Sequence, residues 1–200
     1  MVTVHDVQQG SDIWHKLREG LYTGADADKL LVHGKSIKIV DGVIMGYGQN
    51  EVSTFRGNFY TKRGHILEDQ AIDFYQDING IYVPRPGFVT NDRFPHCGYS
   101  PDGYPPDRNL EVKAFNMKKH LALYKGDIPL KILAQIYFGL VISEKTFAEL
   151  VIINPDFAKR IIDGVQNPNY NPKLAYKAIP IKLTYSIKKH FENRLREAFV

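Results

Sequence analysis

The feature that most constrains the fold is the segment Leu110-Glu111-Val112-Lys113-Ala114, in which apolar and charged residues alternate. Successive side chains of an extended strand point to opposite faces, so Leu110, Val112 and Ala114 share one face while Glu111 and Lys113 share the other. An apolar face of this kind packs into a core. The pattern therefore predicts a strand that is fixed by its buried side and holds a carboxylate next to an amine on its other side.

A turn sequence, Ser100-Pro101-Asp102-Gly103, precedes this strand. An antiparallel return of the chain after the turn would bring the Asp102 carboxylate beside Glu111. Two carboxylates held together supply the hard oxygen ligands that suit Mg²⁺ or Mn²⁺. Lys113 would then reach an attacking water or a phosphate. This layout is typical of metal-dependent phosphodiesterases.

The same residues also have a purely structural interpretation. Ser-Pro-Asp-Gly is an ordinary turn sequence, and a Glu-x-Lys pair on a strand is often a solvated pair that contributes only about 0.2–1 kcal/mol. From these residues alone, both interpretations stay open.

Composition bounds the class of protein. With 200 residues, 44% of them hydrophobic, the chain is long enough for one sizeable core, and we expect a single domain over residues 1–200. The one cysteine, Cys97, excludes an intrachain disulfide and a four-cysteine metal site. The sequence has no signal-peptide pattern and no apolar run near the roughly 20 residues of a membrane span, so we expect a cytoplasmic protein. A net charge of +4 is compatible with nucleic acid and is shared by many unrelated enzymes.

The apolar periodicity predicts helices and strands in alternation, hence an α/β or α+β domain with a central mixed sheet flanked by helices. Thr23 and Asp26 resemble a capping box. The expected helices cover 11–19, a segment opening at 23, 58–77, 116–124, 129–141 and the tail from 186. The expected strands cover 81–84, 87–90, 110–114, 147–153 and 178–183, with a hairpin at 36–45.

Five ordered motifs, spanning roughly residues 7–140, resemble those of a known family. The segment from Gln9 to Thr23 has Gln-Gly, Trp, Leu-Arg, Gly and Thr in the order and spacing of the opening motif of the lambda-type alkaline exonucleases, the YqaJ-like viral recombinase family. The similarity continues in four further motifs: Gly64 with Glu68 and Ala71, the Ser-Pro-Asp-Gly turn, Glu-x-Lys, and Ala134-Gln135.

This resemblance implies a restriction-endonuclease-like core with a PD-(D/E)-x-K site. Asp102 and Glu111 would be the principal ligands of Mg²⁺ or Mn²⁺, with two ions expected. The backbone carbonyl of Val112 would be a further ligand. Glu68 would approach the metals directly or through water.

The resemblance implies that Lys113 orients or deprotonates the attacking water and that Gln135 helps to position it. For both Glu68 and Gln135 a structural alternative remains. A glutamate in a helix is more often solvent-facing, and a glutamine among apolar residues can instead bond a neighbouring backbone group.

For the 5′ end of the DNA, the resemblance implies that Arg18 clamps a terminal phosphate, since a guanidinium can hold two phosphate oxygens at once. Ser100 would add a hydroxyl donor, and Thr23 is a further candidate. The chain departs from the family at Ala25, where a serine is common. Trp14 is expected mainly to pack in the core.

The implied activity is a 5′-to-3′ exonuclease that degrades one strand of linear double-stranded DNA and leaves a 3′ overhang for phage-type recombination. The implied partners are DNA ends, further copies of the chain in a trimer, and a single-strand annealing protein, with no membrane. The implied setting is the cytoplasm of a bacterial host, with a phage or prophage origin. Two alternatives remain: a non-catalytic DNA-binding module of the same fold, and an endonuclease with the same metal site.

Overall fold

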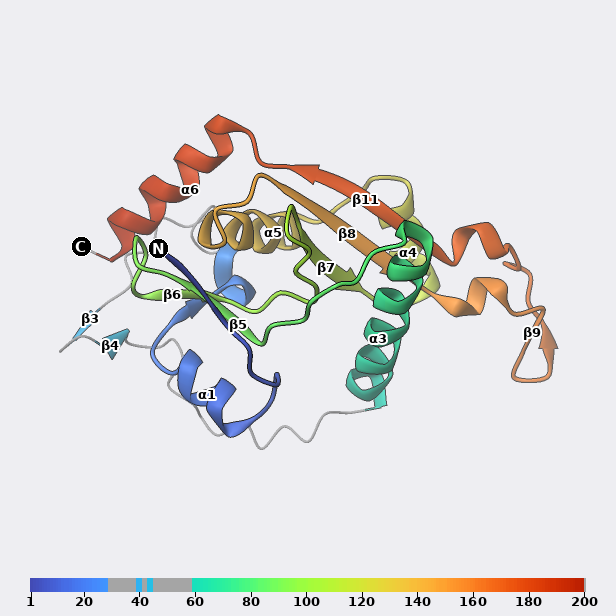
Figure 1. Ribbon diagram of the computed structural model, residues 1–200. Coiled ribbons are helices and arrows are strands. Elements are labelled where there is room, and N and C mark those ends of the chain that lie inside the picture. The colour runs from blue at the N-terminus through green and yellow to red at the C-terminus, as the bar shows by residue number, and fades with distance from the viewer. Residues whose placement is uncertain (29–38, 41–42, 45–58, 200) are drawn as a thin grey trace.

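The computed structural model describes residues 1–28, 39–40, 43–44 and 59–199 (Figure 1). The helices in these residues are α1 (Asp12–Arg18), α3 (Phe59–Asn79), α4 (Met117–Tyr124), α5 (Leu130–Ile142) and α6 (Tyr185–Ala198), with short 3₁₀ turns η1 (Gly24–Asp26), η2 (Pro155–Ala158) and η3 (Pro172–Leu174). The strands are β1 (Val2–His5), β2 (Tyr22–Thr23), β3 (Ile39–Val40), β4 (Val43–Ile44), β5 (Phe88–Asn91), β6 (Cys97–Tyr99), β7 (Asn109–Lys113), β8 (Phe147–Ile153), β9 (Ile161–Ile162), β10 (Val165–Gln166) and β11 (Tyr176–Lys182).

The strands form two mixed sheets and two hairpins. One sheet has the order β1-β5-β6-β2, with β2 parallel to β6 and the other pairs antiparallel. The second has the order β11-β8-β7, with β7 parallel to β8 and β11 antiparallel to it. The expected mixed α/β architecture is confirmed. Within the described residues, the strands that were expected in one central sheet are divided between two.

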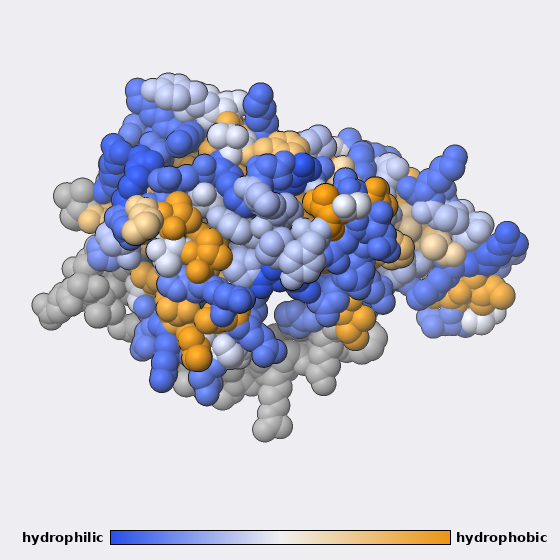
Figure 2. Space-filling view, in the orientation of Figure 1, coloured by the Kyte–Doolittle hydropathy of each residue, from blue (hydrophilic) through white to orange (hydrophobic). Residues whose placement is uncertain are grey.

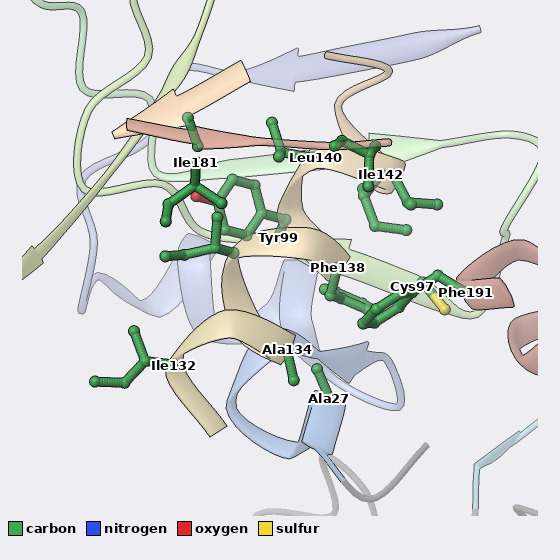
Figure 3. Close-up of a cluster of buried hydrophobic side chains, with 14 of the residues drawn as sticks. Ala27, Cys97, Tyr99, Ile132, Ala134, Phe138, Leu140, Ile142, Ile181 and Phe191 are labelled. Atoms are coloured by element: carbon green, nitrogen blue, oxygen red, sulfur yellow. The ribbon is translucent and has the colours of Figure 1, made fainter. Parts of the chain in front are cut away.

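Helices cover both faces of the β11-β8-β7 sheet (Figure 1). Because side chains alternate along β8, Leu150 and Ile152 face α5 and α6, whereas Val151 and Ile153 face α3. The larger apolar cluster lies on the α5 and α6 side and includes Phe138 and Phe191 (Figure 3). The smaller cluster, on the α3 side, contains the strand residues Leu110 and Val112 with α3 residues such as Ala71 and Tyr75.

Local sequence explains where the helices begin and end. Ser11 caps α1 by accepting from the Trp14 backbone N–H, and Asn116 caps α4 by accepting from the Lys119 backbone N–H. Gly20, just beyond α1, takes a positive φ of 71°. In α6, Phe191 and Leu195 are buried, so the four-residue apolar repeat of the tail faces the core as predicted.

Two predictions are wrong. Residues 81–84 form no strand, because the Val83 N–H donates to the Gln76 side chain and Pro84 has no N–H for a ladder. The capping box at Thr23 is the second: Thr23 makes no capping hydrogen bond and belongs to β2, where it pairs with Gly98. The 3₁₀ turn η1 follows and residues 27–28 are helical, while the rest of the helix expected to open at 23 lies outside the described residues. The predicted hairpin is confirmed through β3 and β4, while its turn residues Asp41-Gly42 lie outside the described part of the chain.

Among the helices that the structure describes, none is both long enough and apolar enough to cross a membrane.

Candidate metal and DNA-end site

The turn before β7 returns against that strand, as predicted. Gly103 and Leu110 form an antiparallel bridge, in which the Leu110 N–H donates to the Gly103 carbonyl at 2.8 Å. The turn needs glycine because a Cβ on Gly103 would lie 2.7 Å from Val83 Cγ1. Asp102 Oδ2 accepts a 2.7 Å hydrogen bond from the Val112 N–H. The Asp102 carboxylate is therefore fixed to the edge of β7.

Pro101 stops the bridge between Gly103 and Leu110 from extending into a longer ladder. After the bridge between Gly103 and Leu110, the next hydrogen-bonded pair of an antiparallel ladder would be Pro101 with Val112. Pro101 has no N–H to donate, and Asp102 already occupies the Val112 N–H. The N–H and the carbonyl of one strand residue point to the same side. The Val112 carbonyl therefore faces the Asp102 side with no ladder donor opposite it.

Glu111 is buried beside this edge, with only 1% of its surface exposed. Its Oε1 accepts from Lys113 Nζ at 2.5 Å, while its Oε2 is buried without a hydrogen-bond partner. A buried carboxylate oxygen that lacks a donor is costly. The interpretation of Glu111 and Lys113 as a solvated surface pair is therefore wrong.

The pKa values of this cluster are shifted as expected for crowded acids. Burial, with the nearby charge of Glu68, raises the pKa of Asp102 to about 6, against the opposing effect of Lys113. Burial also raises the pKa of Glu111 to about 7, with Lys113 opposing and Asp102 adding to the shift. Burial alone would lower the pKa of Lys113, but the charges of Glu111 and Asp102 outweigh it and raise the pKa. Lys113 therefore stays protonated.

Glu68 projects from α3 toward the same region. Its Oε1 accepts from Arg85 Nη2 at 2.6 Å, and Arg85 Nη1 lies 2.5 Å from Asp69 Oδ1. The Arg85 Nε donates to the backbone carbonyl of Asp102 at 3.1 Å. Glu68 is thus half-buried and ion-paired, not simply solvent-facing.

Asp102, Glu111 and Glu68 do not form a compact three-carboxylate cluster. Over the described residues, no three His, Cys, Asp or Glu side chains gather closely enough to form a metal cluster. The structure brings Asp102 and Glu111 to one edge, with Glu68 held beside them through Arg85. The metal role of Glu68 stays a prediction.

Gln135 lies on α5, the helix that covers the face of the sheet to which Glu111 and Lys113 belong. It packs on η1, where its Cγ would be 3.2 Å from a Cβ on Gly24. Within the described residues it forms no hydrogen bond to either carboxylate. Its proposed contact with water is therefore untested.

The N-terminal motif docks on the turn that carries Asp102. Gln9 Nε2 donates to the Pro101 carbonyl at 3.0 Å. Arg18 Nη1 donates to Ser100 Oγ at 2.9 Å, and its guanidinium lies 4.1 Å from the centre of the Trp14 ring. Burial lowers the pKa of Arg18. Two motifs that are some 80 residues apart thus meet at Ser100.

Trp14 has a more specific position than core packing. It is only half-buried, and its indole N–H donates to the Gly87 carbonyl at 2.9 Å and to Ser100 Oγ at 3.2 Å. It therefore supports both Arg18 and Ser100. The spacing of Trp14 and Arg18 on one helix was the only sequence signal for this role.

Thr23 lies on β2 beside β6, the strand that runs directly into Ser100. Its hydroxyl makes no capping bond, and Ala25 in the following turn is exposed. Thr23 therefore lies on the strand next to the one that leads into Ser100, and none of its described contacts is with Arg18.

A cleft of about 690 Å³ lies next to these groups, on the side where α1 and α3 face each other. Figure 2 shows the surface hollowed there. The cleft is lined by Gln8, Gln9, Gly10, Trp14, His65, Glu68, Asp69 and Arg85. It therefore borders both the Arg18–Trp14 stack and the Glu68–Arg85 pair.

Cys97 takes no part in this site. It is buried in the larger apolar cluster, and burial strongly raises the pKa of its thiol. A thiol in such surroundings is a poor nucleophile.

Sequence reasoning missed Arg85. It stands in Pro84-Arg85-Pro86, outside the motifs, and only the structure reveals its contacts with Glu68 and Asp102. A charged residue between two prolines was the one available signal.

Known proteins resemble this chain both in sequence and in structure. Residues 13–146 match the sequence model of the YqaJ-like viral recombinase domain. No curated protein matches the chain. The alkaline exonuclease LHK-Exo from Laribacter hongkongensis has a similar structure, with a TM-score of 0.67 and 17% identity over 93% of this chain and 89% of that one.

The complex of LHK-Exo with dAMP gives a TM-score of 0.67 at 18% identity, over 92% of this chain and 89% of that one. A phage-related exonuclease from Haemophilus somnus 129PT gives a TM-score of 0.55 at 14% identity, over 92% of this chain and 94% of that one. At these identities the likeness establishes a shared fold. The family match covers about two thirds of the sequence, and the chain belongs to the YqaJ-like viral recombinase domain family.

Proposed function

We propose that this protein is a metal-dependent deoxyribonuclease of one domain, which degrades one strand of linear double-stranded DNA from its 5′ end. The observation that carries the proposal is that Asp102 is bonded to the Val112 N–H, next to the buried Glu111, whose Oε2 has no hydrogen-bond partner. Family membership supports a nuclease, and two proteins of the same fold are described as exonucleases.

The donor set fits a hard divalent cation. Asp102 and Glu111 each use one oxygen for a protein donor, which leaves Asp102 Oδ1 and Glu111 Oε2. The Val112 carbonyl faces the Asp102 side, and Glu68, whose charge helps to raise the pKa of Asp102, would act through water. Oxygen ligands alone favour Mg²⁺ or Mn²⁺. When bound, a pair of such ions would lower the pKa of bound water from 15.7 to as little as about 7 and stabilise the leaving oxygen.

The protein's own groups would orient the reaction. Lys113 stays protonated beside Glu111, so it acts as a donor to the attacking water or the phosphate and not as a base. Gln135 approaches from α5, on the same face of the sheet. Glu111 holds the Lys113 amine in place through their 2.5 Å contact.

At the DNA end, Arg18 and Ser100 would bind the 5′ phosphate, with Thr23 on the neighbouring strand. The Arg18 guanidinium is held by the Trp14 ring and by the Ser100 hydroxyl, so little side-chain freedom is lost on binding. Asp102 follows Ser100 by two residues, which sets the metal ligands next to the bound end. Family membership further suggests a trimer, a 3′ overhang used with an annealing protein, and action in the cytoplasm of a phage host.

The test uses linear and covalently closed circular duplexes with Mg²⁺ or Mn²⁺. The wild-type protein should release mononucleotides from the linear DNA alone. Asp102→Asn and Glu111→Gln should each lower that release by more than about 100-fold, because a direct ligand is worth more than the outer contacts that cost 10–100-fold.

Asp107→Asn is the matched control. Asp107 is an exposed carboxylate five residues from Asp102 and pairs with Arg108, so its loss should leave the release unchanged. Cutting of the circles would identify an endonuclease. No release from either substrate would favour a binding module, and full activity of Asp102→Asn would remove Asp102 from the site.

A further inference from the structure

We propose that Arg85 is a positioning residue that fixes Glu68 relative to the Asp102 turn and thereby sets the affinity of the site for its metal ion. The inference rests on the proposed function and adds a residue that none of the sequence motifs includes.

The contacts of Arg85 join two separate elements. One planar guanidinium reaches Glu68 Oε1 at 2.6 Å and Asp69 Oδ1 at 2.5 Å on α3, and it reaches the Asp102 backbone carbonyl at 3.1 Å in the turn. A guanidinium can make these three bonds at once because its N–H groups lie in a fixed fork. Arg85 therefore ties the helix that carries Glu68 to the turn that carries Asp102.

The backbone around Arg85 is itself held. The Tyr104 N–H donates to the Pro84 carbonyl at 2.8 Å, and the Trp14 indole donates to the Gly87 carbonyl at 2.9 Å. A Cβ on Gly87 would lie 2.1 Å from the Val7 carbonyl oxygen, so the chain passes very close to the N-terminal segment. Arg85 thus projects from a short segment that is fixed on both sides.

Arg85 leaves both carboxylate oxygens of Asp102 and Oε2 of Glu68 without a bond from its guanidinium. Arg85 binds Asp102 through its backbone and Glu68 through one oxygen only. Without Arg85, the negative charges of Glu68, Asp69 and Asp102 would repel one another, and Glu68 would be free to turn into the cleft. The arginine holds Glu68 near Asp102 without competing for the same oxygens.

The experiment measures Mn²⁺ affinity of the full chain by electron paramagnetic resonance, with no DNA present. Arg85→Gln should weaken Mn²⁺ binding about 10-fold, as the loss of an outer-shell contact does. If Arg85 acted through its charge alone, Arg85→Gln would instead tighten Mn²⁺ binding, because a positive charge near the cation site would be removed. Unchanged or tighter binding by Arg85→Gln would therefore overturn the inference.

Arg93→Gln is the matched control. Arg93 is an exposed arginine that also pairs with two carboxylates, Glu144 and Glu192, and it touches none of the site residues. Its variant should bind Mn²⁺ like the wild-type protein. Arg85→Lys keeps the charge but lacks the wide planar fork that spans acceptors on two elements, so it should also bind more weakly. Full rescue by lysine would contradict the inference.

A double-mutant cycle with Glu68→Gln tests the route of the effect. If Arg85 acts through Glu68, adding Arg85→Gln to Glu68→Gln should change the affinity by less than about 2-fold. Fully additive losses would overturn the inference. Loss of binding in Asp102→Asn with full binding in Arg85→Gln sinks the inference alone, whereas no Mn²⁺ uptake by the wild-type protein sinks the proposed function with it.

Discussion

At the scale of single residues, the unusual feature is that each acid of the site has one oxygen tied to the protein. Val112 donates to Asp102, Lys113 to Glu111, and Arg85 to Glu68. Each side chain is therefore oriented before any ligand arrives, which lowers the entropy that binding would cost.

The raised pKa values predict how the stability of the metal-free protein depends on pH. In the unfolded chain these acids titrate near pH 4, but in the folded protein Asp102 titrates near 6 and Glu111 near 7. Between about pH 4 and pH 7, the folded protein therefore binds more protons than the unfolded chain. Its free energy of unfolding should fall as the pH rises from about 4 to about 7.

Urea unfolding in the presence of a chelator measures this dependence. Glu111→Gln should flatten the fall, because one titrating group is gone, whereas the exposed Asp107→Asn should leave it in place. An equally steep fall in Glu111→Gln would show that Glu111 does not titrate in this range.

The roles of individual residues were only partly readable from the sequence. Alternation placed Glu111 and Lys113 on one face, and the turn placed Asp102 opposite them, because both arguments depend on local geometry. The contacts of Arg85 and the hydrogen bonds of Trp14 depend on residues 16–86 positions away. No local pattern encodes such distances.

At the scale of elements, β7 is an edge strand whose free side is blocked by a turn instead of another strand. The helices and the long strands β8 and β11 were close to their predicted bounds, since their periodicity is strong. The predicted strand at 81–84 failed because its backbone bonds to a side chain and a turn. Backbone partners of this kind override strand propensity.

Pro101 offers a test of the Val112 carbonyl, which side-chain substitution cannot reach. Pro101→Ala supplies an N–H that can donate to that carbonyl. The new donor should compete for the carbonyl and weaken Mn²⁺ binding several-fold.

Pro105→Ala, in the loop just beyond the turn, controls for the loss of a proline. Its carbonyl, which accepts from Lys145 Nζ at 2.7 Å, is retained in the variant. Mn²⁺ affinity in Pro101→Ala equal to that of the Pro105→Ala control would argue against the carbonyl as a ligand.

At the scale of the whole molecule, the fold brings the N-terminal motif and the Ser100–Asp102 turn together across the sequence. The overall α/β architecture followed from the alternation of helical and strand periodicity. The division into two sheets did not, because it depends on pairings between strands that are far apart in the sequence.

This long-range docking predicts how Arg18 contributes to end recognition. Arg18→Ala removes the charge that the Trp14 ring and Ser100 hold in place, so the ratio of digestion rates on 5′-phosphorylated and 5′-hydroxyl duplexes should fall to about one. Parallel time courses on the two substrates measure that ratio. Lys16→Ala, an exposed cation on the same helix, should keep the wild-type ratio; a preserved ratio in Arg18→Ala would assign Arg18 to structure alone.

Ser100 and Asp102 belong to one short turn, in which the Pro101 carbonyl accepts from Gln9 and the Asp102 carboxylate accepts from the Val112 N–H. Under the proposed function, the turn sets a fixed distance between the bound DNA end and the acidic residues. The bond that is cut would always lie at the same distance from the 5′ phosphate bound at Arg18. Each round of cleavage would therefore remove the same number of nucleotides.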